Sequence, residues 1–503
     1  MLHKASYSLE ISVISSLSKD TFIYGIRNIS WCECFVQVLT LAFPSIIGYV
    51  ADMILETINL FFIGRLNDYR YLAACGLGNC WLNMTCFSFL LGSASAIETF
   101  CSQAFGKNDL KLCGAYHNRA RVIIFLCSFP CLILIWNAGR ILTFIGIDRD
   151  VATYAGYYVI HLMPGFFFFT QFEITRRFVI SQGIFKVPTY IICTSTCFHI
   201  LWCYIFIIIL DWGLLGACVA TNITWVLDFF LLTGYIQITG CCEESWYLPG
   251  SESLKNWGSF FKLALPSALM LMVEWCGSEL MAVEAGYLDP VQMAANVTLI
   301  NIMGIIFMIP SGVSTTVSIL VGTSIGAGNS YNAKMYAIVC LIIGIAILLF
   351  IMFLLTGFRV LIASLFTNDL EVITWIKRLL PILGLVGLFD GIQCILAGLV
   401  KGMGRQQIAS VASIISYYLI MQPACLFLAF KCGLEIYGLW IGAVIGQLSA
   451  VLFYTGIILS QNWKTVVEDT QLRLKQEMNN LSRVDEDNDS SSTSKDKFLS
   501  ANY

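Results

Sequence analysis

The chain has 503 residues, of which 58% are hydrophobic and only 12% charged, and its formal net charge is −3. Soluble domains carry about 25% charged residues, so this composition excludes an ordinary water-soluble protein and predicts a membrane protein. The near-neutral charge shows no basic excess that would attract nucleic acid, and we expect no nucleic-acid partner.

Apolar runs long enough to cross a bilayer recur along the whole chain, and each is near or above the roughly 20 residues that a crossing helix needs. Polar residues interrupt the second and the fourth run. The predicted helices are 36–62, 74–100, 118–138, 152–180, 188–210, 214–238, 258–285, 293–320, 335–356, 373–400, 408–430 and 436–460. The predicted fold class is therefore an all-α polytopic membrane protein with twelve transmembrane helices.

The basic residues predict the orientation. With the amino terminus inside, the loops on the cytoplasmic side hold more Lys and Arg than the outer loops, which is the usual bias, so we expect both termini in the cytoplasm. Residues 464–482 can form an amphipathic surface helix, and the Ser-, Asp- and Lys-rich segment 483–503 is expected to be disordered. The predicted division is 1–35 (cytoplasmic segment), 36–240 (N-lobe), 241–257 (cytoplasmic linker), 258–462 (C-lobe) and 463–503 (cytoplasmic tail).

The two halves of the chain resemble each other. Residues 43–45 (FPS) match 265–267 (LPS), and 92–106 (GSASAIETFCSQAFG) line up with 312–326 (GVSTTVSILVGTSIG), both at an offset of about 220 residues. Such repeats are typical of secondary transporters, whose substrate sites lie near the bilayer midplane between or within the halves. The repeat predicts two pseudo-symmetric six-helix lobes.

The cysteines and histidines form no metal-binding or disulfide pattern. The 20 cysteines are scattered without a CxxC pair, and the four histidines lie far apart. Zinc sites and disulfide frameworks have closer, recurring spacings. We therefore expect no metal and no cofactor, and cysteines that act mainly as small core residues.

Acidic residues inside the predicted spans are the main functional signal, because a charge at membrane depth costs roughly 2.5–3.5 kcal/mol on insertion scales. Glu274 lies deep in the seventh span, beyond Pro266. Asp390, in the tenth span, shares a helix face with Gln393 and has no basic residue nearby on its helix. A buried carboxylate without a basic partner can hold a proton near neutral pH. We expect Glu274 and Asp390 to load and release that proton.

Other acids are secondary candidates or structural. Glu279 and Glu284 follow Glu274 at steps of five, so the three cannot all face one cavity.

Asp52 and Glu56 are one turn apart in the first span and form a second acidic pair. Together with Asn83 they are secondary candidates. Glu98 and Glu173 fall near predicted cytoplasmic helix ends, and we interpret them as loop anchors and caps.

Several motifs together resemble the multidrug and toxic compound extrusion (MATE) family, in its eukaryotic, plant-like branch. The similarity covers roughly residues 35–465, and it implies two six-helix lobes, alternating access, and efflux of mostly cationic organic compounds in exchange for protons or sodium. The motifs are SAIETFCSQAFGKND (95–109), LALPSALMLMVEWCGSEL (263–280), FMIPSGVSTTVSILVGTSIGAGN (307–329), LFDGIQCILAGLVKGMGRQ (388–406) and YGLWIG (437–442).

The resemblance also implies roles for single residues. The family's seventh-helix acid corresponds to Glu274, with Glu279 as a second acid, and its tenth-helix acid corresponds to Asp390. The animal branch has an eighth-helix acid where this chain has Asn301. Many bacterial members have a first-helix acid where this chain has Asn59, which argues against coupling through the amino lobe.

We therefore expect a transporter and not an enzyme, exporting small organic cations or amphipathic metabolites and xenobiotics in exchange for H⁺, with Na⁺ as the other possible coupling ion. We expect a monomer in contact with membrane lipid. Aromatic residues would hold a cation by stacking and cation–π contact. The substrate-binding candidates are Glu279, Asn301, Gln393, Tyr417, Trp275 and Phe389.

Alternatives stay open at this point. A lipid or lipid-linked saccharide flippase would need basic cavity residues for phosphate, whereas the spans carry acids. An enzyme would need clustered histidines, metal-spaced acids or a nucleophile with its base, and no such pattern is visible. A regulatory scaffold would leave the buried acids without a purpose. The sequence fits the plasma membrane and an acidic organelle such as a vacuole equally well.

Overall fold

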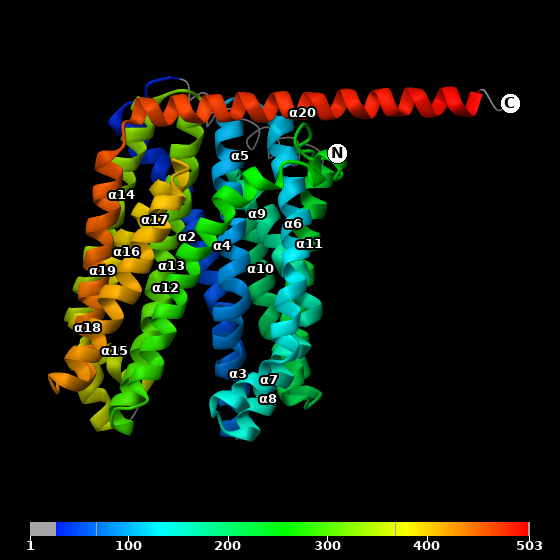
Figure 1. Cartoon of the computed structure of the whole chain (residues 1–503). Coiled ribbons are helices and arrows are strands. Elements are labelled where there is room, and N and C mark those ends of the chain that lie inside the picture. Colours follow the sequence, from blue (N-terminus) through cyan, green and yellow to red (C-terminus); the bar gives the residue numbers. More distant parts are fainter. Residues whose placement is uncertain (1–26, 67, 368, 501–503) are drawn as a thin grey trace, which may run out of the picture.

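A computed structural model describes residues 27–66, 68–367 and 369–500, with side chains described as far as Ser482. Its elements are helices, most of them long rods that run side by side (Figure 1). The amino-terminal half contains α2 (Trp31–Ile63), α3 (Tyr69–Leu82), the π-helical turn η1 (Asn83–Phe87), α4 (Ser88–Ala94), α5 (Ala96–Gly106), α6 (Leu110–Trp136), α7 (Ala138–Ile145), α8 (Arg149–His161), α9 (Met163–Ser181), α10 (Lys186–Cys203), η2 (Tyr204–Ile209) and α11 (Gly213–Thr239). The other half contains η3 (Ser251–Leu254), α12 (Trp257–Ala285), α13 (Pro290–Gly326), α14 (Ser330–Gly357), α15 (Arg359–Phe366), α16 (Leu370–Gly402), α17 (Gln406–Ile414), η4 (Ile415–Met421), α18 (Gln422–Leu426), η5 (Phe427–Lys431), α19 (Glu435–Ser460) and α20 (Trp463–Ser500).

The prediction of twelve transmembrane helices in two lobes is confirmed. Eleven helices of the described chain are long and apolar enough to cross a membrane. The twelfth span, α8 with α9, does not meet that standard because α9 carries Glu173, Arg176 and Arg177 within 19 residues. Both spans that polar residues interrupt also deviate from a regular α-helix. The second contains the π-helical turn η1, and the fourth is divided into α8 and α9 at Leu162.

Local signals set the helix ends. The first span begins at Trp31, earlier than the predicted residue 36, because Ser30 and Glu33 form a capping box ahead of it. Asp109 Oδ1 accepts a hydrogen bond from the Leu112 amide (2.9 Å), and Asn329 Oδ1 accepts one from the Asn332 amide (3.0 Å). These two N-caps follow the matched repeat segments, so the repeat extends to the helix starts.

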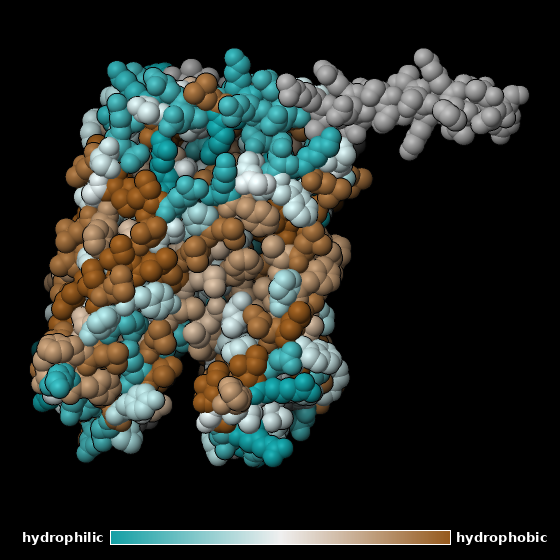
Figure 2. Space-filling view, viewed as in Figure 1, coloured by the Kyte–Doolittle hydropathy of each residue, from teal (hydrophilic) through white to brown (hydrophobic). Residues whose placement is uncertain are grey.

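The spans form two lobes, α2–α11 and α12–α19, that meet at one end and separate at the other. Figure 2 shows a notch between the lobes at the end opposite α20, and a band of hydrophobic surface between two polar ends. We call the end covered by α20 the α20 end. The band has the pattern expected of a protein that spans a bilayer.

The internal repeat becomes the contact between the lobes at the α20 end. A Cβ on Gly106 of α5 would lie 2.0 Å from the Thr323 carbonyl oxygen, and a Cβ on Gly326 of α13 would lie 2.0 Å from the Gln103 carbonyl oxygen. Only glycine permits such an approach of two backbones. The last glycines of the two matched segments therefore let α5 and α13 close against each other.

The helix expected over 464–482 forms the first part of α20, which lies across this end (Figure 1). The helix continues to Ser500, so the expectation of disorder after residue 482 is wrong for the backbone up to Ser500. Extending a helix that has already been nucleated costs little per residue. The last three residues lie outside the described part.

Candidate functional site

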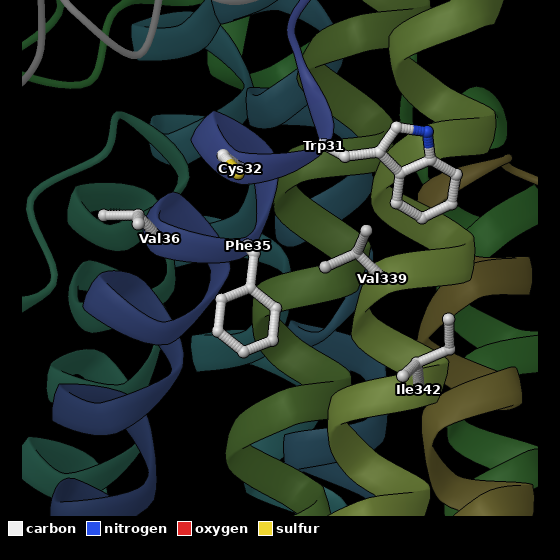
Figure 3. Close-up of a pocket in the computed structure, with 6 residues that line it drawn as sticks. All are labelled: Trp31, Cys32, Phe35, Val36, Val339 and Ile342. Carbon is white, nitrogen blue, oxygen red and sulfur yellow. The ribbon is translucent and has the colours of Figure 1, made fainter.

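Two hollows differ in their chemistry. A groove on the outside between α2 and α14 is lined by Trp31, Cys32, Phe35, Val36, Val339 and Ile342 (Figure 3). It is apolar and belongs to the hydrophobic band. The second hollow lies between the lobes, with about 1450 Å³ of empty space including the part open to solvent. Its walls come from α2, α9 and α11 on one side and α12, α13 and α16 on the other. This cavity thus lies between the halves, where the repeat predicts a substrate site.

Two carboxylates from different helices meet on the C-lobe side. Glu274 of α12 lines the cavity, and its Oε1 is buried without a hydrogen bond from any described residue. Asp390 of α16 is 5% exposed and lies close enough to Glu274 for the two charges to interact. Among the described side chains neither carboxylate forms an ion pair. Lys401 is the basic residue that Glu274 interacts with electrostatically.

Uncharged polar side chains lie beside both members of this pair. Gln393 lies beside Glu274, and Tyr417, in the π-helical turn η4, lies beside Asp390. The Tyr417 hydroxyl exchanges hydrogen bonds with the Gln447 amide (3.2–3.3 Å). The structure therefore brings four predicted residues into one cluster, and we call Glu274, Asp390, Gln393 and Tyr417 the C-lobe cluster.

Two further polar residues beside this cluster were not predicted from the sequence. Gln447 and Tyr454 of α19 are buried, and the Tyr454 hydroxyl lies 2.9 Å from Ser413 Oγ. The available signal was a polar side chain within an otherwise apolar span, which in a membrane usually has a partner.

Three predicted site residues lie elsewhere. Glu279 accepts a hydrogen bond from the Cys80 thiol (3.2 Å) of the opposite lobe. Asn301 is exposed, and its amide donates to the Val297 carbonyl of its own helix (3.0 Å). Phe389 is half-buried and is not one of the residues lining the cavity. Glu279 lies five residues beyond Glu274 on α12, so its side chain points about 140° away around the helix. Phe389 points about 100° away from its neighbour Asp390 on α16.

The N-lobe wall carries an ion network, so the interpretation of Glu98 and Glu173 as loop anchors and caps is wrong. Arg176 contacts Asp52 (Nη1 to Oδ2, 3.1 Å) and Glu173 (Nε to Oε1, 2.9 Å). Arg177 forms a direct ion pair with Glu98 and lies 3.6 Å from Glu173. All but Asp52 are buried. The network comes from three helices, so spacing within one helix reveals only the pairs of Glu173 with Arg176 and Arg177 and not those with Asp52 and Glu98.

Other N-lobe positions divide between the cavity and the lobe interior. Asn83, Glu56 and Trp275 (the last from α12) line the cavity, as predicted site residues should. Asp228, which the sequence analysis missed, also lines it and is hydrogen-bonded to Ser195.

Asn59 lies inside the N-lobe instead. Its amide donates to Thr221 (2.9 Å), and its Oδ1 lies 3.1 Å from His199 Nε2. A neutral polar cluster thus occupies the position where the family resemblance places the bacterial acid.

The cavity as a whole is acidic. Its lining holds six acids and three bases, Asp52, Glu56, Glu98, Glu173, Asp228 and Glu274 against Arg176, Arg177 and Lys401. An acidic cavity of low dielectric attracts cations and disfavours anions.

Comparisons with known proteins agree with this arrangement. The MatE family matches residues 44–205 and 266–427, one segment in each half. Protein DETOXIFICATION 16 of Arabidopsis thaliana is 32% identical over 84% of this chain and 88% of that protein. Multidrug and toxin extrusion protein 1 of Homo sapiens is 28% identical over 89% of this chain and 78% of that protein.

Solved structures give the same result. The eukaryotic MATE transporter AtDTX14 is similar with a TM-score of 0.84 and 26% identity, covering 88% of this chain and 99% of that one. The Vibrio cholerae MATE transporter VcmN in the bent form matches with a TM-score of 0.74 and 18% identity, over 88% and 99% of the chains, and shows a shared fold alone.

Proposed function

Because the chain belongs to the MATE family of membrane transporters, we propose that it exchanges protons for small organic cations or cationic amphipathic compounds. The observation that carries this proposal is the contrast between the N-lobe wall and the acidic pair of the C-lobe, of which Glu274 lines the cavity and Asp390 is buried next to it without belonging to the lining. Arg176 and Arg177 form ion pairs with the N-lobe acids Asp52, Glu98 and Glu173. Glu274 and Asp390 of the C-lobe instead lie close together without an ion pair among the described side chains.

The C-lobe pair supports direct competition between proton and substrate. Two carboxylates this close in a buried site repel each other when both are ionised. Either a proton or the positive group of a substrate is enough to relieve the repulsion between the two carboxylates. Loading one therefore releases the other, and antiport follows without a separate coupling device.

Aromatic and acidic residues on the walls support an organic cation as cargo. Phe87, Phe169, Trp225 and Trp275 line the cavity beside the acids. Aromatic faces bind alkylammonium groups through cation–π contact and stacking. A phosphate-bearing flippase substrate is disfavoured because acids outnumber bases on the lining.

We place the α20 end in the cytoplasm, with both termini on that side, in the plasma membrane or an acidic organelle such as a vacuole. The bias of basic residues supports this orientation. Because the notch between the lobes lies at the opposite end (Figure 2), the structure then corresponds to an outward-open state. One chain forms the whole cavity, which supports a monomer as the working unit.

The test uses purified protein in liposomes with radiolabelled tetraethylammonium as the probe. A pH gradient imposed without sodium should drive uptake of the probe, and Glu274→Gln or Asp390→Asn should abolish that uptake at normal protein abundance. Glu284→Gln is the matched control, since Glu284 lies near the far end of α12 and does not line the cavity. Flux that ignores pH and follows a sodium gradient would overturn proton coupling. Flux of no organic cation under either gradient would overturn the substrate class.

A further inference from the structure

Helix α20 bridges the two lobes at the end where they meet. Its first turns bury Val466 (1% exposed) in a core shared with α13 and α14. A later turn buries Leu474 (0% exposed) in the N-lobe core. One rigid helix thus inserts side chains into both lobes, and Figure 1 shows it lying across their ends.

Polar contacts fix the first part of α20 to the C-lobe. Asp469 forms an ion pair with Arg405 at 2.5 Å, next to the start of α17. The Gln471 amide donates to the carbonyl oxygen of Gly326 (2.5 Å), the last residue of α13. That carbonyl lies at a helix end, where it has no partner within its own helix.

The next turn of α20 is fixed to the N-lobe. Glu477 pairs with Arg119 of α6 at 3.6 Å, and the two side chains are 7% and 3% exposed. Arg473 donates a hydrogen bond to the side-chain oxygen of Gln103 in α5. The same Gln103 amide donates to the Gly402 carbonyl of the C-lobe (2.9 Å). Gln103 therefore joins α5, α16 and α20 at one point.

This point lies directly beyond the cavity. Glu98 and Lys401 belong to its lining, and the next residues along their helices make the contact between the lobes. Thr99 Oγ1 donates to the Lys401 carbonyl (2.8 Å) and accepts from the Gln406 amide (2.9 Å). Opening the cavity toward the α20 end requires these contacts to separate.

We propose that α20 is a strap that holds the lobes closed at this end, and that its N-lobe half must detach before the cavity can open there. The C-lobe and N-lobe contacts lie within a few helical turns of each other, so one helix cannot follow two lobes that move apart. Arg473 and Glu477 are the residues that set the strength of the strap. This role is independent of the coupling ion and of the substrate.

Hydrogen exchange followed by mass spectrometry on the full-length protein tests the strap without any transport step. Glu477→Arg places a like charge beside buried Arg119, and Arg473→Gln removes the charged donor to Gln103. Either should raise exchange in peptides covering α20 and, with it, in the lobe-contact segments 96–106 and 312–326, by about tenfold or more, since exchange follows local opening. Peptides of α15 and η5, at the opposite end, should not change.

Two further variants make the result specific. Arg119→Glu combined with Glu477→Arg restores opposite charges and should return exchange toward that of the unaltered protein. Glu468→Arg makes the same charge change at an exposed position of α20 and should have no effect. If α20 exchanges faster in the double variant Arg473→Gln/Glu477→Arg while 96–106 and 312–326 stay protected, the lobes close without the strap and the proposal is wrong. If α20 itself stays protected in that double variant, these two residues do not hold it, which also contradicts the proposal.

Discussion

Replacing Gly326 with alanine should shift the protein away from the state closed at the α20 end. The new Cβ would lie 2.0 Å from the Gln103 carbonyl oxygen, whereas unstrained heavy-atom contacts lie at roughly 3.5 Å. Helices α5 and α13 would have to separate by roughly 1.5 Å to reach that distance. Overpacking of this kind typically costs about 1–3 kcal/mol. This cost raises the free energy only of the state in which α5 and α13 are in contact at the α20 end.

That cost converts directly into a population change. At about 1.4 kcal/mol per tenfold, the ratio of closed to open molecules at the α20 end should fall by roughly 5- to 150-fold. Hydrogen exchange of segments 96–106 and 312–326 measures the ratio in the purified protein. Gly456→Ala in α19 is the matched control, because no atom lies within 4 Å of the Cβ it would gain. Equal exchange in Gly326→Ala and Gly456→Ala would refute the argument that backbone contact closes this end.

Two further predictions concern single side chains. Arg177→Met leaves Glu98 and Glu173 buried with one cation fewer, and breaking a buried ion pair costs about 3–5 kcal/mol. Thermal unfolding should therefore occur at a clearly lower temperature than in the control Arg140→Met, which changes an exposed position. An equal unfolding temperature in the two variants would contradict the ion network. A hydrogen bond from the neighbouring thiol of Cys242 lowers the pKa of Cys241, in the loop after α11, to about 7, so alkylation of Cys241 should rise with pH and level off above about pH 8 as the thiolate fraction saturates. Alkylation of Cys241 that keeps rising steeply above about pH 9 would contradict that lowered pKa.

The features that could be predicted from the sequence are those determined within a single helix. Hydropathy located the spans, and the intramembrane acids Glu274 and Asp390 stood out because charge is costly there. Gln393 followed from its spacing to Asp390. Tyr417 followed from the family resemblance, and the structure places all four together.

Features that depend on contact between distant helices could not be predicted in the same way. Glu98 looked like a cap because its partner Arg177 can be recognised only when α5 and α9 are placed side by side. The partners of Glu173, Arg176 and Arg177, lie three and four residues further along its own helix, so that part of the network could have been read from spacing. The contacts of α20 with both lobes could not be predicted for the same reason. Its amphipathic pattern predicts a helix with one buried face, but not which lobes that face contacts.

The matched segments 92–106 and 312–326 do more than show that the two halves are similar, because they also form a contact between the lobes. In the structure they pack against each other, and their final glycines allow the two backbones to approach closely at the α20 end. Because one segment belongs to each lobe, a repeat of this kind gives both sides of the contact similar small residues. This contact separates the cavity from the α20 end.

The most direct test of the central claim is proton movement driven by substrate. Purified protein is placed in sodium-free liposomes that contain a pH-sensitive dye, and tetraethylammonium is added to the outside. We predict that cation entry makes the interior more alkaline, because protons leave in exchange, and that Glu274→Gln and Asp390→Asn abolish this signal. Cation entry without a pH change, or an unaltered pH change in both variants, would contradict exchange at the C-lobe cluster.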